Sequence, residues 1–108
     1  MASVDLFDLP AFAPEHRGGP RECADKLLSE SAEVFAEVRV YERHVKRGAA
    51  DVFCRIGRKM VASELADVLQ VCRNICEVCE ITPDTMAAAM AACVDKNRRK
   101  DGGRYGQA

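Results

Sequence analysis

The 108-residue chain has no large excess of either charge and no long apolar run, and both absences restrict its function. It carries 16 basic and 17 acidic side chains, whereas general nucleic-acid and membrane-surface binders carry a strong basic excess. Its longest apolar stretch, residues 86–94, is about half the length of a membrane span. The first residues are acidic and proline-containing, unlike a signal peptide. We therefore expect a cytoplasmic protein that binds no membrane and no stable nucleic acid.

The sequence also lacks internal repeats and the alternating pattern of β-strands, so the expected fold is all-α. Three of the four prolines lie in residues 1–21, which predicts a flexible arm, and residues 101–108 read as a disordered tail. Between them, residues 22–100 are expected to form one helical domain. Gly48 and the Thr82-Pro83 pair mark a helix end and a helix start. Three long helices are predicted, at residues 22–46, 59–80 and 82–100. A short connecting helix is predicted at residues 49–58, between the first two.

The predicted domain is small. About 80 residues remain for the core, near the size at which a single chain is only marginally stable. Helical proteins of this size often gain stability by association with copies of themselves. We therefore expect the bundle to be completed by homo-oligomerisation, as a homodimer or homotetramer.

Six cysteines are many for a chain this short, and Cys72, Cys76 and Cys79 follow one another at helical spacing. In a reducing cytosol a free cysteine behaves as a small apolar residue. A zinc site would need a second ligand pair, and none has suitable spacing. The pattern therefore favours core packing over the alternative, a metal-binding or redox module.

Carboxylates border the apolar faces of two predicted helices. At 100° per residue, Glu64 lies within the apolar arc of the second long helix and Asp67 lies at its border, while Gln70 and Arg73 fall on the solvent side. On the first helix Glu30, Glu33 and Glu37 adjoin the apolar arc. Packing the two arcs together would bring the acids close, and converging carboxylates need a cation. Oxygen ligands suit Mg²⁺, or Mn²⁺, which often link protein carboxylates to phosphates; the alternative is that both sets are solvated helix faces.

The third long helix adds positive charge. Its predicted buried face contains Met86, Met90, Cys93 and Val94, and Asn97 and Lys100 continue that face. Cations and an amide beside a metal site would bind phosphate oxygens. The candidate phosphate-binding residues are Lys96, Asn97 and Arg98. Alternatively, the basic residues only compensate the helix dipole.

Three segments resemble the MazG-like all-α nucleoside triphosphate pyrophosphohydrolases. KLLSESAEVFAEV contains an ExxE motif, Glu30 and Glu33, and ELADVL contains an ExxD motif, Glu64 and Asp67. ITPDTMAAAMAACVDKNRRK is similar to the final helix of the family, with its Asn-Arg ending at residues 97–98. Cys93 stands where many members have a phosphate-binding Lys, for which Lys96, Arg99 and Lys100 remain alternatives.

The resemblance implies hydrolysis of a nucleoside triphosphate to the monophosphate and pyrophosphate. It also implies Mg²⁺ held by the four acids as catalytic residues, a water nucleophile, and a dimeric or tetrameric enzyme. The general base for the attacking water is one of these four acids or Glu37. The competing hypothesis is a non-catalytic helical protein that self-associates or binds other proteins.

Overall fold

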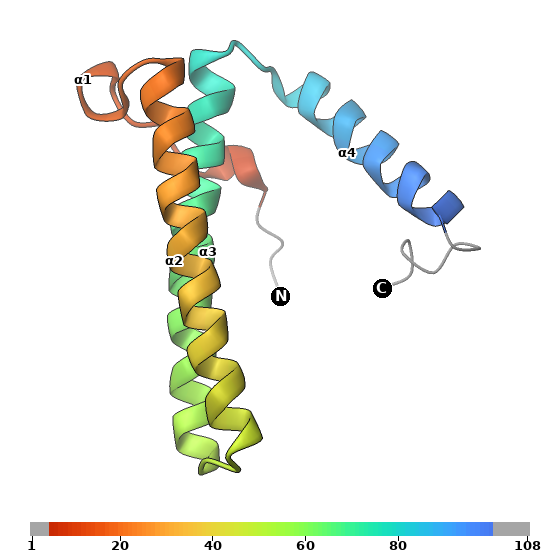
Figure 1. Cartoon of the computed structure of the whole chain (residues 1–108). Coiled ribbons are helices and arrows are strands. Elements are labelled where there is room, and N and C mark those ends of the chain that lie inside the picture. The colour runs from red at the N-terminus through yellow and green to blue at the C-terminus, as the bar shows by residue number, and fades with distance from the viewer. Residues whose placement is uncertain (1–4, 101–108) are drawn as a thin grey trace.

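The computed structural model describes residues 5–100 and is all-helical over that range (Figure 1). The predicted fold class is confirmed. Residues 1–4 and the predicted disordered tail lie outside the described residues. The elements in chain order are a 3₁₀ helix η1 (Leu6–Asp8) and the α-helices α1 (Pro14–Arg17), α2 (Pro20–Lys46), α3 (Asp51–Val78) and α4 (Pro83–Arg99).

Helices α2 and α3 lie side by side as a long antiparallel hairpin (Figure 1). Helix α2 begins where the sequence gives start signals: Pro20 occupies the first turn, and Glu22 Oε1 accepts a hydrogen bond from the Gly19 N–H at 2.9 Å. Such a proline has the φ angle that a helix needs and removes a donor that would lack a partner. No proline interrupts either helix, so both continue for more than seven turns.

Helix α3 corrects the prediction of a separate connecting helix at residues 49–58, because one helix runs unbroken from Asp51. Gly57 lies near the predicted end of that connecting helix. In the structure it is a packing position instead: a Cβ atom there would lie 3.0 Å from Cδ1 of Tyr41 on α2. The missing side chain lets the two helices approach closely around the tyrosine ring.

Both long helices end in the same hydrogen-bonded turn. After α2, the N–H of Ala49 bonds to the carbonyl of His44 at 3.0 Å, and after α3 the N–H of Ile81 bonds to the carbonyl of Cys76 at 2.8 Å. This is the Schellman pattern, in which one residue adopts a left-handed conformation. Gly48 takes that position after α2 with φ 69°, but Glu80 takes it after α3 with φ 57°.

The left-handed backbone conformation at position 80 therefore costs free energy with glutamate, and it would cost little with glycine. We expect Glu80→Gly to raise the free energy of unfolding by about 1 kcal/mol. Gly48→Ala is the matched opposite change and is expected to lower it by a similar amount. Chemical denaturation of both variants checks this, and a destabilised Glu80→Gly protein would contradict it.

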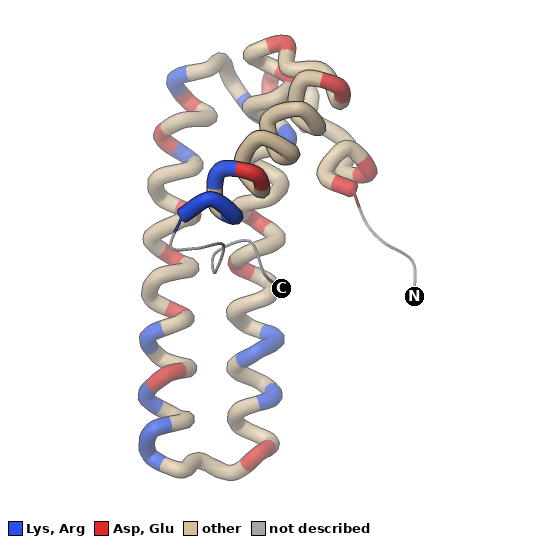
Figure 2. The backbone as a smooth tube through the Cα atoms, turned by 90° about the vertical axis from the view of Figure 1, so that its right-hand side faces the viewer, with Lys and Arg blue, Asp and Glu red and all other residues tan. Residues whose placement is uncertain are grey.

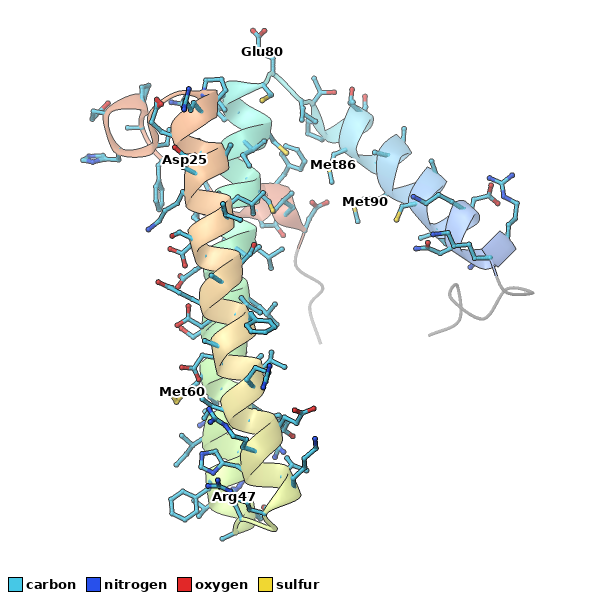
Figure 3. All side chains as sticks on the ribbon, viewed as in Figure 1. Asp25, Arg47, Met60, Glu80, Met86 and Met90 are labelled. Atoms are coloured by element: carbon cyan, nitrogen blue, oxygen red, sulfur yellow. The ribbon has the colours of Figure 1, made fainter. Side chains whose placement is uncertain are left out.

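Helix α4 leaves the hairpin at an angle and packs against neither of its helices (Figure 1). The predicted burial of its apolar face is therefore wrong for the single chain: Met90 is 57% exposed, Val94 45%, and Cys93 is also exposed. Five alanines occupy residues 87–92, and alanine offers little apolar area to hold a helix against a neighbour. Met86 and Met90 lie on the side of α4 that faces the hairpin (Figure 3). A cavity of about 480 Å³ separates them from η1.

The N-terminal segment, residues 5–19, packs on the hairpin, which corrects the prediction of a flexible arm up to residue 21. Helix η1 contacts α3. Arg73 Nε donates to the Leu9 carbonyl at 3.0 Å, and its guanidinium stacks on the Phe7 ring, 4.8 Å from the centroid. Gln70 Nε2 donates to the Pro10 carbonyl at 3.0 Å. Gln70 and Arg73 are thus half-buried rather than on the predicted solvent face, because the N-terminal segment covers them.

Little of the described chain is buried. The buried positions within residues 5–100 are three apolar residues and two polar ones: Cys23, Val71, Cys76, Glu30 and Asn74. Many large apolar side chains of the hairpin are exposed, among them Phe35, Val38, Leu65 and Leu69. None of the described helices combines the length and apolarity needed to cross a membrane.

Candidate metal centre

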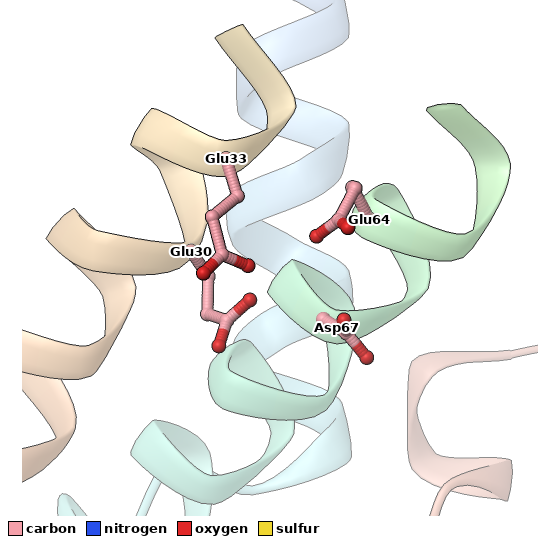
Figure 4. Close-up of side chains that lie close together, drawn as sticks. All are labelled: Glu30, Glu33, Glu64 and Asp67. Carbon is pink, nitrogen blue, oxygen red and sulfur yellow. The ribbon is translucent and has the colours of Figure 1, made fainter. Parts of the chain in front are cut away.

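Four carboxylates meet between α2 and α3, and they are the four that the sequence predicts as metal ligands. Glu30 and Glu33 extend from α2 towards Glu64 on α3, and Asp67 lies one turn further along α3 (Figure 4). One carboxylate oxygen from each lies within 4.8 Å of the others. The three-residue spacing places both acids of each pair on one helix face, and the antiparallel packing brings the two faces together. We call these four residues the acid cluster.

Two oxygens of the acid cluster are buried without a hydrogen-bond partner. They are Oε2 of Glu30 and Oε2 of Glu64. The Glu30 side chain is only 9% exposed, and burying a carboxylate is costly unless a cation or donor compensates it. Solvated surface acids do not have such oxygens. The acid cluster therefore has two unsatisfied acceptors, one on each helix, as a divalent cation site requires.

Among residues 5–100, one basic side chain forms an ion pair with the acid cluster. Lys26, one turn before Glu30 on α2, places Nζ 2.9 Å from Glu30 Oε1. This hydrogen bond lowers the pKa of Glu30 and raises the pKa of Lys26. Lys26 is not among the site residues predicted from the sequence. Its position four residues before a predicted ligand was the available signal.

Glu33 has the opposite pKa shift. The nearby carboxylates of Glu30 and then Glu64 raise the pKa of Glu33, because like charges close together resist joint ionisation. Glu37, the other candidate for a general base, is half-buried and lies outside the acid cluster.

The ligand set fits a hard cation. All four groups are carboxylates, which Mg²⁺ and Mn²⁺ prefer, and Mg²⁺ commonly keeps free positions for water and phosphate oxygens. Acidic residues occur on both helices near the middle of the hairpin, whereas basic residues gather towards its turn and at the end of α4 (Figure 2). The cluster could therefore hold a metal ion, and no other group of three or more acidic, histidine or cysteine side chains within residues 5–100 could do so.

The predicted phosphate-binding residues stand apart from the acid cluster in the single chain. Lys96 and Arg98 are exposed on α4, which projects away from the hairpin (Figure 1). Asn97 is half-buried, with Nδ2 3.6 Å from Sγ of Cys93 on its own helix. The prediction that these residues join the acids therefore does not hold within one chain, because α4 does not fold back along the hairpin.

The cysteines are all free thiols and do not form a metal site in the described chain. Cys76 is buried and Cys72 half-buried, as core packing predicts, but Cys79 is exposed where α3 ends. Burial raises the pKa of the Cys72 thiol, which disfavours the reactive thiolate.

Comparisons of the chain with protein-family models, curated proteins and solved structures gave no significant match. Support for a function therefore comes from the acid cluster and its surroundings.

Proposed function

We propose that the chain is a Mg²⁺-dependent nucleoside triphosphate pyrophosphohydrolase of the MazG-like type. The observation that carries this proposal is the acid cluster: Glu30, Glu33, Glu64 and Asp67 from two helices, within 4.8 Å of one another. Buried, unpartnered oxygens on Glu30 and Glu64 support it independently, because an exposed acidic face would leave both oxygens in water. The same four positions carry the ExxE and ExxD motifs.

The four acids would hold the metal, with Mn²⁺ as an alternative to Mg²⁺. When bound, Mg²⁺ supplies charge neutralisation for the phosphate oxygens and activates a water nucleophile. The reaction consumes one water, breaks the α–β phosphoanhydride bond and gives the monophosphate and pyrophosphate. Within the cluster, Glu33 lies between Glu30 and Glu64, and these neighbours raise its pKa, which favours proton uptake by this carboxylate. We assign Glu33 as the acceptor of the proton from the attacking water.

Lys26 is the cation placed to contact the substrate phosphates. Its side chain is 62% exposed while its ammonium lies against Glu30. A cation there would offset charge on the leaving pyrophosphate. Lys26 would thus provide, next to the cluster, the positive charge that was expected from Lys96 and Arg98.

The experiment that tests the function is a screen of common and modified nucleoside triphosphates. We expect pyrophosphate release with Mg²⁺ and none with EDTA. A non-catalytic interaction protein would release none under either condition. Absence of release across the whole panel, with Mn²⁺ also tested, would refute the enzymatic proposal.

We further propose that the working form is a homodimer or homotetramer. Exposed Leu65 and Leu69 on α3 and exposed Met90 and Val94 on α4 would be covered by a second copy. Such contacts would also offer a route for Lys96, Asn97 and Arg98 to approach the cluster of another subunit. One chain has a mass of 11.9 kDa. Sedimentation equilibrium at micromolar concentration is expected to give at least twice this mass. A monomer under these conditions would contradict the proposal.

A further inference from the structure

A cavity of about 340 Å³ lies beside the acid cluster and shares two of its residues, Glu30 and Asp67. The N-terminal segment contributes Phe12 and Arg17 to its lining, and α3 contributes Val71 and Asn74. Its volume is within the range of small-molecule sites, about 300–1,000 Å³. We call it the N-terminal cavity.

Hydrogen bonds fix the wall that the N-terminal segment forms. The Phe12 N–H donates to Oδ1 of Asn74 at 2.9 Å, across 62 residues of sequence. Gln70 Nε2 donates to the same oxygen at 3.2 Å and to the Pro10 carbonyl at 3.0 Å. Since Asn74 is only 5% exposed, this buried amide determines where Phe12 lies against the cavity.

The lining offers an aromatic face, an apolar wall and unused donors. Phe12 is 48% exposed and Val71 is buried. Both hydrogen bonds of Asn74 use Oδ1 as acceptor, which orients the amide and leaves its Nδ2 hydrogens as donors. Nε of Arg17 is buried without a hydrogen-bond partner. A ligand for this cavity would therefore have a planar ring with acceptor atoms.

We propose that the N-terminal cavity binds the nucleoside part of the substrate, with the base stacked on Phe12 and an acceptor atom of the base on Asn74. The inference rests on the proposed function, because Glu30 and Asp67 belong to both the cavity and the acid cluster. A nucleoside in the cavity has its triphosphate directed to the metal ligands. Phe12 and Asn74 are then residues that determine base affinity, and neither contacts the reacting phosphates.

Phe12→Leu tests the proposal, because leucine keeps the apolar wall and the backbone N–H that bonds Asn74 but removes the aromatic face. Stacking of a base on an aromatic ring contributes to the free energy of substrate binding. We therefore expect KM for the best triphosphate to rise about tenfold, with kcat changed less than twofold. Phe53→Leu is the matched control, since Phe53 is an exposed phenylalanine near the turn of the hairpin. It is expected to leave both constants unchanged.

A second measurement separates failure of the cavity from failure of the enzymatic proposal. Binding of the four common nucleoside monophosphates is followed by NMR in EDTA, without turnover. Binding by the wild type that Phe12→Leu weakens about tenfold supports the cavity, even if no triphosphate is hydrolysed. Normal hydrolysis with equal KM in Phe12→Leu and Phe53→Leu would overturn the cavity and leave the function standing. If the wild type shows no monophosphate binding and no triphosphate hydrolysis, both proposals are wrong.

Discussion

Glu64→Gln is expected to reduce Mg²⁺-dependent pyrophosphate release by at least about a hundredfold while the protein keeps its helical content. Even residues that only orient metal ligands cost 10- to 100-fold on removal, and Glu64 belongs to the ligand set itself. Glutamine has nearly the same volume as glutamate but lacks the charge. Asp67→Asn makes the equivalent change one turn further along α3 and is expected to have the same effect.

Glu42→Gln is the matched control for these variants. Glu42 is a half-exposed acid on α2 that pairs with Lys46 at 3.7 Å, and it lies outside the acid cluster. Its loss should leave turnover within twofold of the wild type, since exposed ion pairs contribute little. Circular dichroism and steady-state kinetics on the three variants give the comparison. Near-normal turnover in both Glu64→Gln and Asp67→Asn would exclude catalysis by the acid cluster.

Saturating Mg²⁺ is expected to raise the melting temperature on the order of 10 °C. A ligand that binds only the folded state stabilises it by about 2.7 kcal/mol at a hundred times its dissociation constant, and a domain of this size gains about 4–8 °C per kcal/mol. Thermal melts at fixed ionic strength, with Mg²⁺ replaced by Na⁺ in the reference, measure the shift. A melting temperature that does not respond to Mg²⁺, even with a non-hydrolysable nucleotide present, would contradict the metal site.

Glu33→Gln is expected to stabilise the metal-free protein at neutral pH and to weaken its response to Mg²⁺. From sequence alone, Glu30→Gln would be the natural choice, but Glu30 already has a counter-ion in Lys26. Glu33 instead has a raised pKa caused by Glu30 and Glu64. A carboxyl whose folded-state pKa is raised favours folding when protonated, and it loses that contribution as the pH rises through the folded pKa.

The advantage of Glu33→Gln over the wild type should therefore be present at neutral pH and disappear in acid. Melts of both proteins in EDTA, from neutral pH down through the range where glutamate titrates, follow the difference. An advantage that grows as the pH falls would have the wrong sign for this account.

Local chemistry made much of the fold predictable. Gly48 after α2 and the Thr82-Pro83 start of α4 lie where the structure places those helix boundaries. The pairing of Glu30 and Glu33 with Glu64 and Asp67 followed from helical periodicity, because a carboxylate within an apolar arc has to face the neighbouring helix.

Features that depend on packing between distant segments were not predictable. Gly57 resembles a helix end until Tyr41 is known to lie against it. Gln70 and Arg73 resemble solvent-facing residues because nothing in their own helix indicates that residues 5–19 cover them. The apolar face of α4 predicts burial but does not specify whether its own chain provides the partner surface.

The ion pair between Lys26 and Glu30 makes cation binding at the acid cluster an exchange. Without metal, the ammonium of Lys26 already occupies one carboxylate oxygen, at 2.9 Å. A divalent ion that takes this oxygen has to release the lysine, so the affinity for Mg²⁺ would be reduced by the cost of breaking that pair. Monovalent ions offer no more charge than the lysine they would replace, which favours divalent over monovalent cations. The released ammonium of Lys26 stays close to the cluster, because Lys26 lies one helical turn from Glu30. Binding of the metal ion would therefore also free a positive charge for an incoming anion.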